Sequence, residues 1–155
     1  MTTDLRKATL CILIKPGKIL LAMKKRGFGA GRWNGCGGKP EPGEDIEQTA
    51  VRETEEEIGV TPVSMRHAAT LTFLFAGKPD WDQEVTVYLV DKWEGEPVET
   101  EEMAPRWFKV NEIPFDKMWS DDVHWLPKVL DGKRVEGTFR FDGNQALTGF
   151  ELKTF

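Results

Sequence analysis

The side chains best suited to chemistry in this sequence are the glutamates of the run Glu53-Thr54-Glu55-Glu56-Glu57. The surrounding segment, 45–58, has helical spacing, which places Glu53, Glu56 and Glu57 within an arc of about 100°. In the last turns of a helix, carboxylates face the negative end of the dipole and repel one another, at a cost of roughly a few tenths of a kcal/mol each. The arrangement therefore indicates a compensating cation.

Oxygen ligands gathered on one rigid face suit Mg²⁺, or Mn²⁺ as a substitute, because these ions complete their shell with water and substrate phosphates. The alternative interpretation is a solvated acidic surface. The adjoining face is expected to pack through an i,i+4 ladder of Ile46, Ala50, Thr54 and Ile58. Arg52 is the one cation of the helix, so it is expected to form a forked pair with a carboxylate, or an ordinary surface salt bridge.

The composition is that of a globular domain. The chain has 155 residues, of which 39% are apolar and 30% charged, enough for a single domain over residues 1–155. The net charge of -5 argues against duplex nucleic acid as a partner. Cys11 and Cys36 form no CxxC pair, and the apolar run 8–14 is too short for a signal peptide or a membrane span. We expect a cytoplasmic monomer that binds no membrane.

The remaining pattern predicts an α+β fold. Strands are expected at 8–14, 19–23, 68–75, 84–92, 106–110, 138–141 and 150–154, with turns at Pro16-Gly17 and Asp142-Gly143. Helices are expected at 45–58, ended by Gly59, and at 122–130. The glycine-rich stretch 24–43 is expected to be a long, shaped loop. Strands outnumber helices without strict alternation, which favours a mixed sheet with helices on its faces.

The residues around the acidic helix match a known motif. Gly38 is followed after five residues by Glu44 and after seven more by Arg52-Glu53, and the run continues to Gly59. Residues 38–60 resemble the Nudix box except at Thr54, which stands where an aliphatic residue is expected but keeps a methyl group for packing. The resemblance implies an α/β/α sandwich with a loop-helix-loop on a mixed sheet. It also implies Mg²⁺-dependent hydrolysis of a nucleoside diphosphate linked to another moiety.

By position, the resemblance makes Glu53, Glu56 and Glu57 metal ligands, assisted by the Gly37 carbonyl, and makes Arg52 the residue that orients the glutamates. A bound metal would neutralise charge on the phosphates and lower the pKa of the attacking water. A glutamate of the cluster would then act as the base.

Within this family the base does not always come from the box. Glu102, in the acidic turn 97–103, is therefore a second candidate as base or metal ligand. The alternative for Glu102 is a solvated surface charge.

Outside the box, the chain resembles the oxidised purine nucleoside triphosphatase branch of the family. The resemblance is carried by the segments 23–39, 70–77, 97–103, 106–115 and 117–127, and it is weakest at 78–83 and after 142. These segments also suit a purine chemically. Asn34 offers a donor and an acceptor to a base edge, and Phe28, Phe73 and Trp119 supply flat apolar walls.

Asp121 and Asp122 are expected to read the other edge of the base. Two adjacent carboxyl groups in an apolar pocket titrate as a pair, so one can keep a proton near neutral pH and donate it to the base. The alternative for this pair is a helix N-cap, and the two roles are compatible if one residue takes each. Thr9 and Lys24 correspond to pocket-lining positions of the family, whereas Trp125 is expected to pack in the core.

The implied activity is hydrolysis of modified purine nucleoside triphosphates, such as 8-oxo-dGTP and 2-hydroxy-dATP, to the monophosphate and pyrophosphate. Two alternatives remain from the sequence. One is a Nudix hydrolase for another nucleotide, such as ADP-ribose or a dinucleoside polyphosphate. The other is a nucleotide-sensing module without turnover, which the intact Arg52 and box glutamates disfavour.

Overall fold

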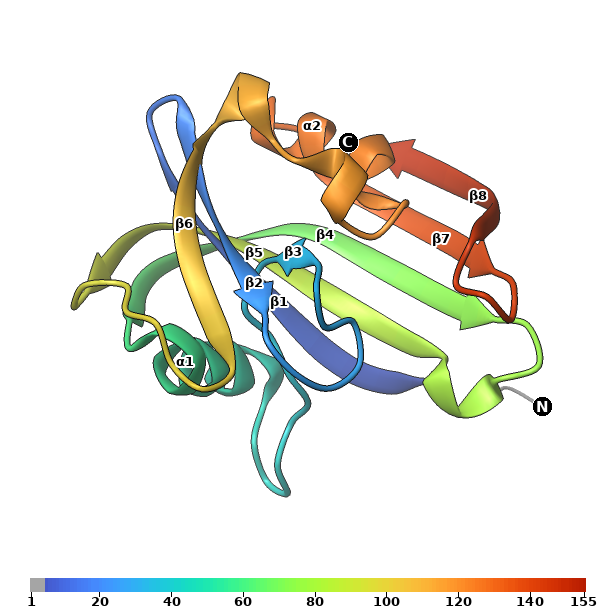
Figure 1. The fold of residues 1–155 in the computed structure, drawn as a ribbon, viewed down its shortest axis with the longest axis horizontal. Coiled ribbons are helices and arrows are strands. Elements are labelled where there is room, and N and C mark those ends of the chain that lie inside the picture. Colours follow the sequence, from blue (N-terminus) through green and yellow to red (C-terminus); the bar gives the residue numbers. More distant parts are fainter. Residues whose placement is uncertain (1–4) are drawn as a thin grey trace.

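An eight-stranded mixed sheet carries one helix against each face in the computed structural model, which describes residues 5–155 (Figure 1). The strands are β1 (Arg6–Lys15), β2 (Lys18–Lys24), β3 (Trp33–Asn34), β4 (Thr61–Phe75), β5 (Gln83–Glu94), β6 (Met103–Lys109), β7 (Val135–Phe141) and β8 (Leu147–Thr154). The helices are α1 (Ile46–Ile58) and α2 (Asp122–Leu130), and short 3-10 turns lie at Pro79–Trp81, Val110–Glu112 and Phe115–Lys117. The expected α+β sandwich is confirmed.

The sheet has the order β3-β2-β1-β5-β4-β7-β8, and β6 pairs with β2. The pairs β1·β5 and β4·β7 are parallel, whereas the other pairs are antiparallel, so the sheet is mixed as expected. Alternation along β1 builds two cores: Ile12 packs with α2, while Cys11 and Leu13 pack with α1. The central strand therefore connects the two helical layers.

Both ends of α1 are capped, and the Gly59 end is the one that the sequence predicted. The Asp45 side chain accepts a hydrogen bond from the Gln48 N–H at 2.8 Å, and Gln48 accepts one from the Asp45 N–H at 2.9 Å. Gly59 has a left-handed φ of 73°, and its N–H donates to the Glu55 carbonyl. Thr54 is fully buried, and its hydroxyl donates to the Ala50 carbonyl at 2.8 Å, so its methyl group packs in the place of the family's aliphatic residue.

Several predicted strands begin or end a few residues away from the observed ones, and the two largest differences are at β4 and in the loop before α1. β4 begins at Thr61 rather than at 68, because its register shifts near Pro62, Ser64 and His67 break the alternation that marks a strand in the sequence. The loop predicted over 24–43 contains β3, whose two residues pair with Ala22 and Met23. That short pairing fixes the direction of the Asn34 side chain.

The predicted hairpin between β7 and β8 is present, but its turn is longer than the Asp-Gly pair indicates. The Asp142 carboxylate accepts hydrogen bonds from the N–H groups of Asn144 and Ala146, and Gln145 has a φ of 65°. The left-handed residue is therefore Gln145 rather than Gly143. No helix within residues 5–155 is long and apolar enough to cross a membrane.

Candidate active site

The loop that precedes α1 runs along β1 at close range. Cys11 and Cys36 exchange two backbone hydrogen bonds, and the Thr9 N–H donates to the Gly38 carbonyl at 2.9 Å. A Cβ atom on Gly37 would lie 1.8 Å from the Thr9 carbonyl oxygen, and one on Gly38 would lie 2.2 Å from Cδ of Glu53. Glycine at both positions therefore lets the loop pass next to the strand and the helix carboxylates.

A single guanidinium organises the acidic face of α1. Arg52 donates from Nε and Nη2 to the two carboxylate oxygens of Glu44 at 2.8 and 2.9 Å. Its Nη1 donates to Glu53 at 2.8 Å and to Glu56 at 3.2 Å, while Nη2 also reaches the Lys39 carbonyl. The bonds from Arg52, with a further one from Thr49, hold the pKa of Glu44 down to about 2. The forked pair expected of Arg52 therefore forms with Glu44, to which the sequence assigned no role.

Glu57 is the most buried carboxylate of the helix, with 9% of its surface exposed. Its Oε2 accepts a hydrogen bond from the Gly37 N–H at 3.0 Å. Burial raises the pKa of the Glu57 carboxyl to about 7, and the Glu53 carboxylate raises it further against the opposing effect of the Gly37 N–H. Glu57 is thus poised between its neutral and charged forms near neutral pH.

The donor set suits a hard divalent cation. Glu53, Glu56 and Glu57 share one helix face, and Gly37 lies against Glu57. Within residues 5–155, no three His, Cys, Asp or Glu side chains are already arranged to hold a metal ion. Instead, Glu53 and Glu56 accept hydrogen bonds from Arg52, while Glu57 accepts one from the Gly37 N–H. A cation would exchange these contacts for direct coordination and offset the carboxylate repulsion.

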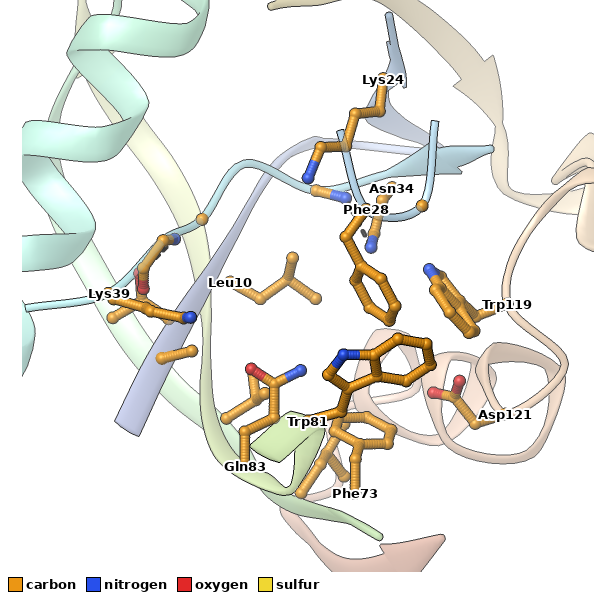
Figure 2. A pocket seen from close by; sticks show the side chains of 18 of the residues that line it. Leu10, Lys24, Phe28, Asn34, Lys39, Phe73, Trp81, Gln83, Trp119 and Asp121 are labelled. Carbon is orange, nitrogen blue, oxygen red and sulfur yellow. Dashed lines mark hydrogen bonds between the residues drawn. The ribbon is translucent and has the colours of Figure 1, made fainter. Parts of the chain in front are cut away.

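A cavity of about 490 Å³ extends from the glycine loop to the N-terminus of α2. All eight residues predicted to bind the substrate line it: Thr9, Lys24, Phe28, Asn34, Phe73, Trp119, Asp121 and Asp122. Gly37 and Glu57 line the same cavity. Figure 2 shows Lys39 on one side of this space and Asp121 on the other, with aromatic rings between them. The geometry thus joins the predicted purine pocket to the buried carboxylate of the box.

Asp121 and Asp122 are 2% and 3% exposed, so the acidic pair is buried in the cavity wall. Asp121 accepts a hydrogen bond from Nε1 of Trp125 at 2.8 Å, and Oδ2 of Asp122 has no hydrogen-bond partner among the described residues. Burial raises the pKa of both carboxyl groups, and the neighbouring Asp121 raises that of Asp122 further. Asp121 occupies the N-cap position of α2 but its side chain caps nothing, so the N-cap alternative is wrong.

Asn34 enters the cavity from β3. Its Oδ1 accepts a hydrogen bond from the Gly35 N–H at 2.8 Å, and its NH₂ group points into the space in Figure 2. Trp125 packs in the core as expected, at 1% exposure, and also borders the cavity through Asp121. The polar side chains that line the cavity therefore include the Asn34 amide and the Asp121–Asp122 carboxyl pair, together with others such as Lys24, Lys39 and Gln83.

Glu102 lies outside the cavity lining. Its carboxylate accepts from Nη2 of Arg26 at 2.7 Å, and this ion pair lowers its pKa. The turn that carries it is held against the end of α1, because the Thr100 hydroxyl donates to the Glu57 carbonyl at 2.7 Å and the Val98 N–H donates to the Ile58 carbonyl. A role for Glu102 as base or metal ligand thus stays a prediction: its turn lies near the end of α1, but its carboxylate is paired with Arg26.

Sequence reasoning missed several residues at the cavity or next to it, among them Trp81, Gln83 and Arg32. Trp81 lines it from the β4–β5 connection and Gln83 from the first residue of β5, both in 78–83, one of the two segments where the family resemblance is weakest. Arg32 stacks its guanidinium 4.1 Å from the ring centroid of Trp119 and donates to Gln145 at 3.2 Å. The one usable signal was a tryptophan in a short polar connection, where exposed indole is uncommon.

Fold and site together define an α+β domain with a nucleotide-sized cavity next to an acidic helix. The profile of the NUDIX domain matches residues 4–129. This chain therefore belongs to the Nudix family.

Similar proteins agree with that assignment. The chain is 45% identical over 144 residues to the oxidized purine nucleoside triphosphate hydrolase of Danio rerio, covering 93% of this chain and 92% of the relative. It is 41% identical over 148 residues to the Mus musculus protein of the same name, covering 96% and 94%. The crystal structure of a MutT protein from Bacillus halodurans superposes with a TM-score of 0.83 at 26% identity, over 96% of this chain and 98% of that one.

Proposed function

We propose that this protein hydrolyses oxidised purine nucleoside triphosphates, such as 8-oxo-dGTP and 2-hydroxy-dATP, to the nucleoside monophosphate and pyrophosphate. The observation that carries the proposal is the single cavity that joins Asn34, Asp121 and Asp122 to Glu57 and the glycine loop. The names of the fish and mouse relatives support it. Hydrolysis of this kind removes damaged nucleotides from the pool used for DNA synthesis.

The base is recognised by groups on opposite sides of the cavity. The Asn34 amide donates to one edge of the purine, and the Asp121–Asp122 pair faces the other. Since burial raises both pKa values, a carboxyl of this pair keeps its proton near neutral pH and can donate to a base oxygen or nitrogen. Moving that proton lets one pocket accept more than one modified purine.

The phosphate chain lies toward the glycine loop, where Lys24 and Lys39 supply positive charge. Arg52 holds Glu53 and Glu56, and the Gly37 N–H holds Glu57. A Mg²⁺ ion bound by Glu53, Glu56, Glu57 and the Gly37 carbonyl, with Glu102 as a further candidate ligand, would neutralise phosphate charge and acidify water.

The oxygen of water bonds to a phosphorus of the α–β phosphoanhydride, the P–O bond of that bridge breaks, and the nucleoside monophosphate and pyrophosphate separate. The water proton passes to a carboxylate. The candidates for this base are the glutamates of α1 and, outside the helix, Glu102.

We further propose that residues 1–155 act as one domain, as a cytoplasmic monomer, without duplex nucleic acid or a membrane as partner. The net charge of -5 and the absence of a disulfide between the buried Cys11 and Cys36 support this setting.

The test is release of pyrophosphate and phosphate, with and without Mg²⁺, from 8-oxo-dGTP, 2-hydroxy-dATP, dGTP and ADP-ribose. We expect Mg²⁺-dependent pyrophosphate release with preference for the oxidised purines. Asn34→Ala should raise KM about tenfold for these substrates, by loss of a buried hydrogen bond, while Asn144→Ala in the exposed β7–β8 turn should not. Preference for ADP-ribose, or binding without turnover in folded protein, would overturn the proposal.

A further inference from the structure

Trp81 is held in a fixed position between β4 and β5. The Asp82 carboxylate accepts from the Phe75 N–H at 2.8 Å, and the backbone N–H groups of Lys78, Trp81 and Asp82 donate to carbonyls at the end of β4 and within the connection. These bonds fold Pro79–Trp81 into a 3-10 turn. The indole is therefore supported by a short, internally bonded segment rather than by a flexible loop.

The indole ring packs against aromatic side chains of the cavity. Its centroid lies 5.0 Å from that of Phe28, with a tilt of 58°, and 5.7 Å from that of Phe75, edge to face. Phe28 in turn lies 5.3 Å from Trp119, tilted by 34°. Trp81, Phe28 and Trp119 come from three separate connections and meet in the cavity wall (Figure 2).

An aromatic surface of this kind is unusual for a chain segment that faces solvent. Trp81 and Phe28 both lie on connections and keep part of their rings open to solvent: Trp81 is partly buried and Phe28 is 43% exposed. Lys78 places its ammonium 5.2 Å from the Trp81 ring centroid. Partly exposed rings in the same cavity as the half-buried Asn34 amide and the buried Asp121–Asp122 pair suit a flat heteroaromatic ligand, because stacking contributes free energy without reading hydrogen bonds.

We propose that Trp81 is a base-contacting residue that makes this cavity selective for bicyclic over monocyclic bases. The inference rests on the proposed function and deepens it, because it assigns part of the purine preference to a segment outside the family's motif. The larger ring overlaps the indole over more of its area, so the stacking free energy is greater for a purine than for a pyrimidine.

The test measures binding of 8-oxo-dGMP, dCMP and pyrophosphate by calorimetry without metal. Trp81→Ala and Trp81→Leu should weaken 8-oxo-dGMP binding about tenfold, weaken dCMP binding less and leave pyrophosphate binding unchanged. Trp81→Phe should keep most of the affinity. The matched control is Trp93→Ala, which also removes an aromatic pair, the one with Trp107 at 5.9 Å, but lies outside the cavity lining.

Several results would overturn the inference. They are wild-type affinity for 8-oxo-dGMP in folded Trp81→Leu protein, equal losses for 8-oxo-dGMP and dCMP, or a parallel loss of pyrophosphate binding. Turnover of 8-oxo-dGTP by the wild-type protein is measured in a separate assay, which tests the proposed function. Normal turnover without any effect at Trp81 removes the inference and leaves the proposed function intact, whereas absence of turnover removes the proposed function itself.

Discussion

Arg52 and Glu44 form a two-pronged ion pair, with both carboxylate oxygens of Glu44 bound by Nε and Nη2 at 2.8 and 2.9 Å. Glu44 also accepts the Thr49 hydroxyl at 2.7 Å, so its own position is fixed. The guanidinium therefore has one immobile partner, and its remaining N–H groups hold Glu53 and Glu56 in place. The pair couples the loop before α1 to the acidic face of the helix.

Arg52→Lys is expected to lower kcat by about 10- to 100-fold, because an ammonium cannot make the fork that orients the glutamates. Thermal unfolding should change little, since most of the pairs involved are partly exposed. The matched control is Arg140→Lys, which disrupts a similar fork to Glu151 on the β7–β8 hairpin. Loss of activity in both variants, or in neither, would contradict the assigned role of Arg52.

Replacing Gly38 or Gly37 with alanine should have different effects, the first on kcat and the second on the melting temperature. The Cβ of Gly38→Ala meets the carboxylate end of the Glu53 side chain, which can shift where backbone cannot, so kcat should fall at least about tenfold while the fold persists. The Cβ of Gly37→Ala meets the Thr9 backbone oxygen, so the melting temperature itself should fall steeply. Gly149→Ala, with open space around its Cβ, is the control. Calorimetry and turnover measured together distinguish these outcomes, and a Gly38→Ala enzyme of full activity would contradict this account.

Much of this site was predictable because its residues are near one another in the sequence or belong to a motif. The helix, its Gly59 cap and the glutamate face follow from local spacing. Arg52 was expected to form a fork, but the sequence could not show which carboxylate would receive it, because that choice depends on how the loop returns Glu44 to the helix.

Other features depend on tertiary geometry that leaves no periodic signal. The first half of β4, 61–67, escaped prediction because its bulges break the alternation. Trp81 was missed because the hydrogen bond from the Phe75 N–H to Asp82, which closes the connection that carries the indole, joins the end of β4 to the residue just before β5. Such contacts become visible only when the β4–β5 connection is folded.

The buried pair at the start of α2 should make the protein less stable as pH rises. Burial raises the pKa of Asp122, so the folded chain binds more protons than the unfolded chain above the ordinary pKa of an aspartate. This stability is fully present below that ordinary pKa and is lost as pH rises through the folded pKa. Asp122→Asn should therefore melt higher than the wild type at pH 8 and similarly at pH 4.

Melting curves across this pH range test the point, with Asp116→Asn as the exposed control. A wild-type melting temperature that rises from pH 4 to pH 8, and falls equally in Asp122→Asn at both values, would contradict the assignment of Asp122 as a buried acid.

Glu57 should make divalent metal binding depend on pH near neutrality. Its pKa of about 7, raised chiefly by burial, means that a large share of the metal-free protein carries a neutral carboxyl near that pH. A cation binds the deprotonated carboxylate, so binding below about pH 7 must displace a proton. The affinity for Mg²⁺ or Mn²⁺ should therefore fall by up to about tenfold for each pH unit below 7 and be constant above it.

Titration calorimetry in buffers of different ionisation enthalpy measures the released proton directly. Glu57→Gln should bind metal weakly, release no proton and lose turnover while it keeps the fold. Glu55→Gln, on the exposed side of the same helix, should behave as the wild type. Because Glu53 lies beside Glu57 and its pKa is also raised, first by burial, a proton release that survives in Glu57→Gln would assign the titration to Glu53 instead. Metal affinity that is flat from pH 5.5 to 8 would show that neither carboxyl is protonated before the cation arrives.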